Sequence, residues 1–284
     1  MLTAEELRQI RRLHVQAGRR VDSLLAGDYR SAFKGSGMEF DEVRPYVPGD
    51  DVRRIDWNVT ARSGEPFLKT FREERELTLL VMMDVSGSMR FGSGGRDGRT
   101  DKRLQTARVA GGLAYAALRS GDRVGMVTFT DHVEHFLPPR KSRSHGWQVI
   151  RAAFEHVAAS PQTDLAGALA FASKVLKRRA VVVILSDFLA PVPYDRALGA
   201  LARRHRVHAL VLHDPLESAL PDVGLLTLRD AESGAIRLVA GGSRSSQPPA
   251  ERLDRVRRAG VRASLLGTDE DAFLRLQVHF RTAR

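Results

Sequence analysis

The sequence contains no cysteine, which excludes disulfide bonds, thiolate metal sites and cysteine nucleophiles. A reducing compartment is the simplest setting for such a chain, so we expect a cytoplasmic protein. Long hydrophobic runs are also missing, because the two most apolar stretches, residues 77–83 and 180–185, are far shorter than the roughly 20 residues of a membrane-spanning helix. The N-terminal residues include early acids and no apolar core, which argues against a signal peptide. We therefore expect a soluble protein.

Aromatic residues make up only 6% of the 284 residues, although the formal net charge is +11. The whole charge excess lies after residue 76, because residues 1–76 carry 14 basic and 14 acidic side chains. The arginine clusters at 203–206 and 252–258 have no aromatic side chains between them on which bases could stack. We therefore expect a solvated basic face or a docking surface for an acidic partner, and no nucleic-acid binding.

One decapeptide, residues 79–88 with the sequence LLVMMDVSGS, joins an apolar run to a polar end. An apolar run of this length is typical of a strand that is buried on both faces of a parallel sheet. Asp84, Ser86 and Ser88 then lie in the loop at the carboxyl end of the strand, where open α/β sheets bind their ligands. One carboxylate and two hydroxyls in that loop predict a cation site.

The chain after residue 76 alternates between strand and helix patterns. Strands are predicted at 77–84, 122–130, 132–137, 180–187, 207–213 and 261–266, helices at 101–118, 147–157, 165–176, 194–204, 249–259 and 269–280, and a hairpin near 224–240. This alternation predicts an α/β fold with a doubly wound, mostly parallel sheet that helices cover on both faces.

The first 76 residues follow a different pattern. A capping box at Thr3 and Glu6 begins a predicted helix over residues 4–25. Residues 35–76 then read as short extended pieces, including one around Trp57, with charges of alternating sign that predict an ion-pair network beside buried aromatic side chains. We expect two regions, 1–76 and 77–284, with the first packed on the sheet of the second because it has too few apolar residues for its own core.

Two further loops at predicted strand ends or helix starts carry oxygen donors. Thr163 and Asp164 lie in one, and Ser186 and Asp187 in the other. Hydroxyls with a few carboxylates, and no His or Cys, suit a hard ion such as Mg²⁺ or Mn²⁺. An ion that its ligands neutralise so poorly would attract a carboxylate from a partner.

Residues 84–88 (DVSGS) resemble the metal-ion-dependent adhesion site of von Willebrand factor A-type domains, in which a Thr of a second loop and an Asp of a third complete the site. Thr163 and Asp187 match those two positions in order. The resemblance implies a von Willebrand factor A-like fold and five metal ligands, namely Asp84, Ser86, Ser88, Thr163 and Asp187. It also implies that the hydroxyls can bind the ion directly and that the Asp residues often act through water.

Residues 36–76 resemble the signature of the domain of unknown function 58 family. The residues that carry this resemblance are Glu39, Arg44, Tyr46, Gly49, Asp50, Asp51, Arg53, Ile55, Asp56, Trp57, Ala61, Arg62, Lys69 and Glu73. Members of that family are similar to A-type domain proteins that work with MoxR-type AAA+ ATPases. The resemblance implies a non-enzymatic, metal-dependent adaptor in the maturation or remodelling of other proteins, whose partner, such an ATPase or its client, presents an acidic side chain.

Two alternatives remain open at the level of sequence. One is an interaction scaffold that keeps the ligand set but works without a metal. The other is a Mg²⁺-dependent aspartyl phosphatase with Asp84 as nucleophile, although such enzymes usually need a second Asp where this chain has Ser86. The sequence also lacks a G-x-S-x-G elbow and a Gly-Lys-Ser/Thr phosphate loop, so we expect no enzyme.

Overall fold

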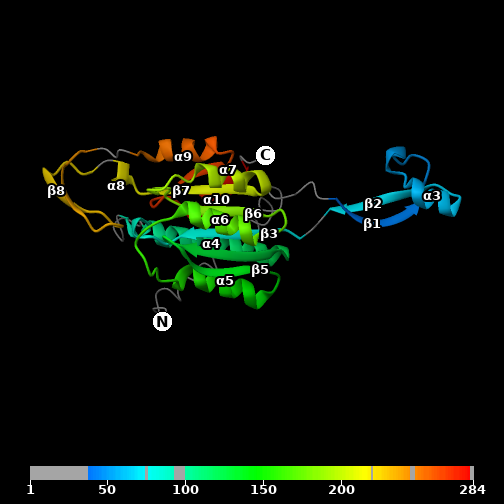
Figure 1. The fold of residues 1–284 in the computed structure, drawn as a ribbon, viewed down its shortest axis with the longest axis horizontal. Coiled ribbons are helices and arrows are strands. Elements are labelled where there is room, and N and C mark those ends of the chain that lie inside the picture. Colours follow the sequence, from blue (N-terminus) through cyan, green and yellow to red (C-terminus); the bar gives the residue numbers. More distant parts are fainter. Residues whose placement is uncertain (1–37, 74–75, 93–99, 219, 244–246, 282–284) are drawn as a thin grey trace. The chain divides into compact units, whose positions relative to one another are not determined.

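The computed structural model describes residues 38–73, 76–92, 100–218, 220–243 and 247–281 (Figure 1). Among the described residues, those up to Leu77 form one compact unit and those from Thr78 on belong to another. The helix predicted over residues 4–25 lies outside the described residues.

The smaller unit is built on two antiparallel strands, β1 (Met38–Pro45) and β2 (Phe67–Glu73). The connection between them contains a short 3-10 helix, η2 (Val52–Arg54), and the helix α3 (Trp57–Ser63). Arg44 and Asp50 form a bidentate ion pair with two nitrogen–oxygen distances of 2.7 Å. This pair confirms one part of the predicted ion-pair network.

The prediction of an extended piece around Trp57 is wrong, because the helix α3 begins at this residue. The carboxylate of Asp56 accepts a hydrogen bond from the backbone N–H of Asn58, 3.0 Å away, and so caps the helix. Gly64, with a φ of 76°, ends it in a left-handed conformation. The Trp57 side chain is also 69% exposed, so it is no buried aromatic neighbour of the ion pairs.

The larger unit contains a six-stranded sheet. Its strands are β3 (Thr78–Asp84), β4 (Arg123–Phe129), β5 (Val133–Arg140), β6 (Val181–Ser186), β7 (Arg206–His213) and β10 (Arg262–Gly267). Their order is β10-β7-β6-β3-β4-β5, and every pairing is parallel except that of the edge strand β5 with β4. This confirms the predicted fold class, an α/β fold with a doubly wound and mostly parallel sheet.

Helices cover both faces of this sheet. On one face, α4 (Lys102–Ser120) packs against α5 (Arg143–Glu155) and α10 (Ala272–Arg281). On the other, α6 (Leu165–Val175), α7 (Asp195–Arg204) and α9 (Pro249–Arg258) share a hydrophobic cluster with Leu80 and Met82 of β3. Residues 79–83 of β3 are all fully buried, as expected for a central strand covered on both faces.

Three short elements lie among the remaining loops of the larger unit. They are η3 (Gly87–Arg90), α8 (Pro215–Ser218) and an antiparallel hairpin of β8 (Leu225–Arg229) and β9 (Ile236–Ala240). The hairpin predicted near 224–240 is therefore confirmed. In Figure 1, β8 lies at the left, beyond one end of the sheet.

The order of the strands places a topological switch point between β3 and β6. The chain leaves β3 through α4 toward β4, whereas it leaves β6 through α7 toward β7 on the opposite side. Open α/β sheets bind ligands at the carboxyl ends of two such strands, where the loops diverge. Asp84 ends β3 and Ser186 ends β6, so both lie at this crevice.

Candidate metal centre

Asp84 is the central carboxylate of the crevice and is fully buried. Its Oδ1 accepts hydrogen bonds from the backbone N–H of Ser86 at 3.0 Å and from Ser86 Oγ at 2.6 Å. Its Oδ2 accepts one from Ser186 Oγ at 2.6 Å. Burial, together with the negative charge of Asp187, raises the pKa of Asp84 to about 7. Asp84 therefore connects the β3 loop to the end of β6. A nearby cation would stabilise the ionised form of its carboxylate.

Three of the predicted ligands, Ser86, Ser88 and Thr163, are hydroxyls. Ser86 Oγ is 3.2 Å from Ser88 Oγ, and it donates its single proton to Asp84. Thr163 Oγ1 donates to Oε1 of Glu232 at 2.7 Å. Because the protons of Ser86 and Thr163 are directed to carboxylates, lone pairs of these two oxygens remain available to a cation.

Asp187 is paired with a buried cation of the chain itself. Its Oδ2 accepts a hydrogen bond of 2.6 Å from Lys102 Nζ, and its Oδ1 accepts one of 3.1 Å from the backbone N–H of Leu189. Burial alone would raise the pKa of Asp187, but the charge and hydrogen bond of Lys102 outweigh it, so the pKa is lowered. Lys102 also forms an ion pair with Glu217 of α8.

Arg252 of α9 completes the charged network behind Asp187. Its Nη1 donates a hydrogen bond of 2.6 Å to the backbone oxygen of Asp187, and its Nη2 lies 3.3 Å from Oε2 of Glu217. The residue is only 4% exposed. Arg252 therefore does not belong to the solvated basic face that was expected for residues 252–258.

Hydrogen bonds connect three of the predicted ligands, because Ser86 is linked to both Asp84 and Ser88. Thr163 is linked to Glu232. Asp187 is near enough for its charge to raise the pKa of both Asp84 and Glu232.

Asp164, the second oxygen donor noted in the Thr163 loop, has a different role. Its Oδ1 accepts a hydrogen bond of 2.9 Å from the backbone N–H of Gly167 and so caps α6. Ser186 likewise serves to orient Asp84. The patterns used to predict the site did not include Lys102, Glu217, Glu232 or Arg252, which packing alone brings to it.

The predicted ligands are mostly hydroxyl oxygens, which suit a hard divalent ion. They form neither a histidine-rich nor a carboxylate-rich centre. Among the described residues, no three His, Asp or Glu side chains are grouped closely enough to hold a metal by themselves. Octahedral Mg²⁺ binds oxygens at about 2.1 Å, which places neighbouring ligand oxygens about 3 Å apart. The distance of 3.2 Å between the Ser86 and Ser88 oxygens is close to this spacing. The hydroxyls would have to supply much of the coordination.

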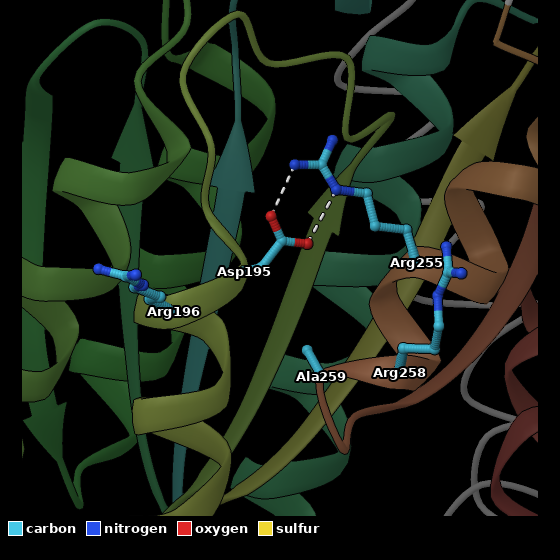
Figure 2. A pocket seen from close by; sticks show the side chains of 5 residues that line it. All are labelled: Asp195, Arg196, Arg255, Arg258 and Ala259. Carbon is cyan, nitrogen blue, oxygen red and sulfur yellow. Dashed lines mark hydrogen bonds and ion pairs between the residues drawn. The ribbon is translucent and has the colours of Figure 1, made fainter.

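A separate hollow of about 420 Å³ lies on the outer surface between α7 and α9 (Figure 2). Its lining residues are Asp195, Arg196, Arg255, Arg258 and Ala259. Arg255 pairs with Asp195 at 2.8 and 2.7 Å, and Arg196 points away from that pair in Figure 2. The hollow is therefore part of the basic surface and is distinct from the crevice at Asp84.

None of the helices in the described ranges has both the length and the apolar character that crossing a membrane requires.

Comparison with solved structures supports the fold. An aerotolerance-related membrane protein from Bacteroides fragilis, solved with multiple mutations to serines, aligns with a TM-score of 0.51 and 15% identity over 73% of this chain and 98% of that protein. BatB from Bacteroides thetaiotaomicron aligns with a TM-score of 0.49 and 14% identity over the same shares of the two chains. At such low identity, the first likeness shows the fold alone.

Comparison with known sequences identifies the family. An uncharacterized protein of Mycobacterium bovis is 36% identical over 230 residues, which are 80% of this chain and 71% of the relative. An uncharacterized protein of Mycobacterium tuberculosis matches with the same figures. The family described as "Protein of unknown function DUF58" matches residues 42–259. The family predicted from the sequence is thereby confirmed, and the chain belongs to the DUF58 family.

Proposed function

We propose that this protein is a non-enzymatic adaptor that binds a carboxylate of a partner protein through a Mg²⁺ or Mn²⁺ ion at the crevice. The observation that carries the proposal is the hydroxyl arrangement at the crevice, where the Ser86 and Thr163 protons are directed to carboxylates and Ser88 Oγ lies 3.2 Å from Ser86 Oγ. These three oxygens would hold the ion. Asp84 and Asp187 would neutralise part of its charge and orient the hydroxyls.

The ion would supply a positive charge that its few anionic ligands leave incompletely neutralised. A carboxylate of a partner is the chemical group that such a site attracts most strongly. The backbone N–H of Gly87 donates a hydrogen bond of 2.7 Å to the oxygen of Pro161, which ties the loop of Ser86 and Ser88 to the loop that contains Thr163. The protein would thus contribute to the metal site a fixed set of oxygen ligands at the switch point of the sheet.

A MoxR-type AAA+ ATPase, or a client protein that such an ATPase remodels, is the proposed partner. Membership of the DUF58 family supports this, because family members resemble A-type domain proteins that work with these ATPases. The complete lack of cysteine supports the cytoplasm as the location.

A pull-down from the native host tests the proposal, with Mg²⁺ or with EDTA, using the wild type and Asp84→Asn. We expect the wild type to retain an AAA+ ATPase or its client only with Mg²⁺, and Asp84→Asn to lose it. The exposed Asp254 of α9 gives a matched control, Asp254→Asn, which should behave like the wild type. Capture that survives both EDTA and Asp84→Asn would contradict the metal-dependent mechanism.

A metal-free scaffold is the second candidate, and the ion pair of Lys102 with Asp187 favours it. The Lys102 side chain is fully buried and supplies a cation to the crevice without any metal. Calorimetric titration separates the two candidates, since a scaffold would bind neither Mg²⁺ nor Mn²⁺ and would still capture its partner.

An aspartyl phosphatase has the least support. A nucleophile needs an accessible lone pair, whereas Asp84 is fully buried and both of its oxygens accept hydrogen bonds from serine hydroxyls. We expect no Mg²⁺-dependent turnover of p-nitrophenyl phosphate, and measurable turnover that Asp84→Asn abolishes would reverse this conclusion.

A further inference from the structure

The turn of the β8–β9 hairpin places a carboxylate at the crevice. Oε1 of Glu232 accepts the 2.7 Å hydrogen bond from Thr163 Oγ1, although the two residues are 69 positions apart in the sequence. Thr163 is one of the three hydroxyls proposed above to hold the ion. Glu232 therefore lies where the carboxylate of a partner would be expected to bind.

Backbone contacts fix the turn in this position. The carbonyl group of Ala231 lies so close to Gly87 that a Cβ at position 87 would overlap its oxygen. Oδ1 of Asp230 accepts hydrogen bonds from the backbone N–H groups of Glu232 at 3.2 Å and Ser233 at 2.7 Å. The turn thus packs on the DVSGS loop with Glu232 held within it.

The rest of the hairpin buries little surface. Within β8 and β9, only Leu226 and Val239 are half-buried, and these two residues are paired with each other across the hairpin. Glu232 in the turn is half-buried as well. The contacts of the turn are therefore a large part of what holds the hairpin at the crevice, and its release would expose little apolar surface.

We infer that Glu232 is a built-in carboxylate ligand of the ion, which a partner's carboxylate must displace together with the hairpin turn. The inference rests on the proposed function of the site. An internal ligand competes at a high effective concentration, of the order of millimolar or above for a short connection. A lone carboxylate in solution would therefore compete poorly, and a protein partner would need further contacts to displace Glu232.

Chemical rescue tests this inference by calorimetric titration with Mn²⁺ in the presence and absence of sodium acetate. We expect Glu232→Ala to weaken Mn²⁺ binding about tenfold, as loss of a ligand or its support does. Acetate should restore the affinity of Glu232→Ala, because the truncated side chain leaves room for it. It should not restore Glu232→Gln, whose amide fills the same space. The exposed Glu251 of α9 provides the control, Glu251→Gln, with wild-type affinity.

The outcomes separate this inference from the proposed function. If the wild type binds Mn²⁺ and Glu232→Ala binds it equally well, the inference is overturned and the metal site stands. A loss of affinity that acetate does not restore also overturns it, because Glu232 would then serve only the turn. If neither the wild type nor the Glu232 variants bind Mn²⁺, the metal site itself fails and the inference fails with it. Binding by the variants alone would show that Glu232 excludes the ion, which again overturns its role as a ligand.

Discussion

Lys102 Nζ lies 2.6 Å from Oδ2 of Asp187, and neither side chain has significant contact with solvent. The pair joins the first residue of α4 to the loop after β6, which are 85 positions apart in the sequence. Because Lys102 also pairs with Glu217, one buried ammonium serves two carboxylates. The candidate metal centre therefore has a fixed positive charge on one side, which holds Asp187 ionised.

Replacement of Lys102 by methionine should destabilise the fold strongly. The change leaves Asp187 and Glu217 without their shared cation, and breaking a buried ion pair by removing one partner costs about 3–5 kcal/mol. Urea unfolding measures the difference. Lys174→Met on the exposed side of α6 is the control and should change the free energy of unfolding by less than about 0.5 kcal/mol. A Lys102→Met protein as stable as this control would contradict the importance of the pair.

Substitution of Gly87 by alanine should displace the hairpin turn. The new Cβ would overlap the carbonyl oxygen of Ala231 and lie 3.1 Å from that of Pro161. Overpacking of this kind typically costs about 1–3 kcal/mol. Hydrogen exchange over residues 225–240 should become faster. Gly199→Ala is the control, because its Cβ would meet nothing nearer than 3.7 Å and should leave exchange in the hairpin unchanged.

Thr163 offers a test of the hydroxyl ligands that preserves side-chain volume. Thr163→Val removes the oxygen that donates to Glu232 and would hold the ion, so Mn²⁺ affinity should fall about tenfold or more. Thr163→Ser keeps the oxygen and should bind within about threefold of the wild type. Calorimetric titration compares the three proteins. Equal affinity of the Val variant and the wild type would remove Thr163 from the proposed site.

Two buried histidines should make the fold sensitive to acid. His208 Nδ1 lies 3.0 Å from His279 Nε2, and burial, with neighbouring positive charge, lowers the pKa of His208 to about 3 and that of His279 to about 4. The unfolded chain, whose histidines titrate near 6.5, therefore binds more protons than the folded one between about pH 6.5 and 4. Stability should fall as the pH falls through this window, by up to about 1.4 kcal/mol per pH unit for each histidine.

Urea unfolding at several pH values measures this dependence. His208→Gln should flatten the slope between about pH 6.5 and 4, since one of the two protons is no longer taken up on unfolding. Lys174 of α6 is exposed and its ammonium does not titrate in this range, so Lys174→Gln should leave the slope as it is in the wild type. A slope that does not differ between wild type and His208→Gln would contradict the assignment.

Local patterns in the sequence determined the fold class and the place of the site. The buried apolar run of β3 and the alternation of strands and helices are properties of neighbouring residues, and parallel connections follow a rule of handedness. The same rule brings strand ends to one edge of the sheet, so Asp84 and Asp187 could be expected at one crevice. The joint pattern of residues 36–76 and 84–88 also predicted the family.

Only the tertiary structure decided which other side chains meet there. Lys102 follows a helix cap, Glu232 lies in a hairpin turn and Arg252 belongs to an arginine-rich helix, and each position is typical of an exposed side chain. Their burial results from packing between segments far apart in the chain, for which a local pattern holds no information. The sequence thus determined the oxygen donors of the crevice, and the fold decided the charges that surround them, because charge balance in a buried site depends on which distant segments pack together.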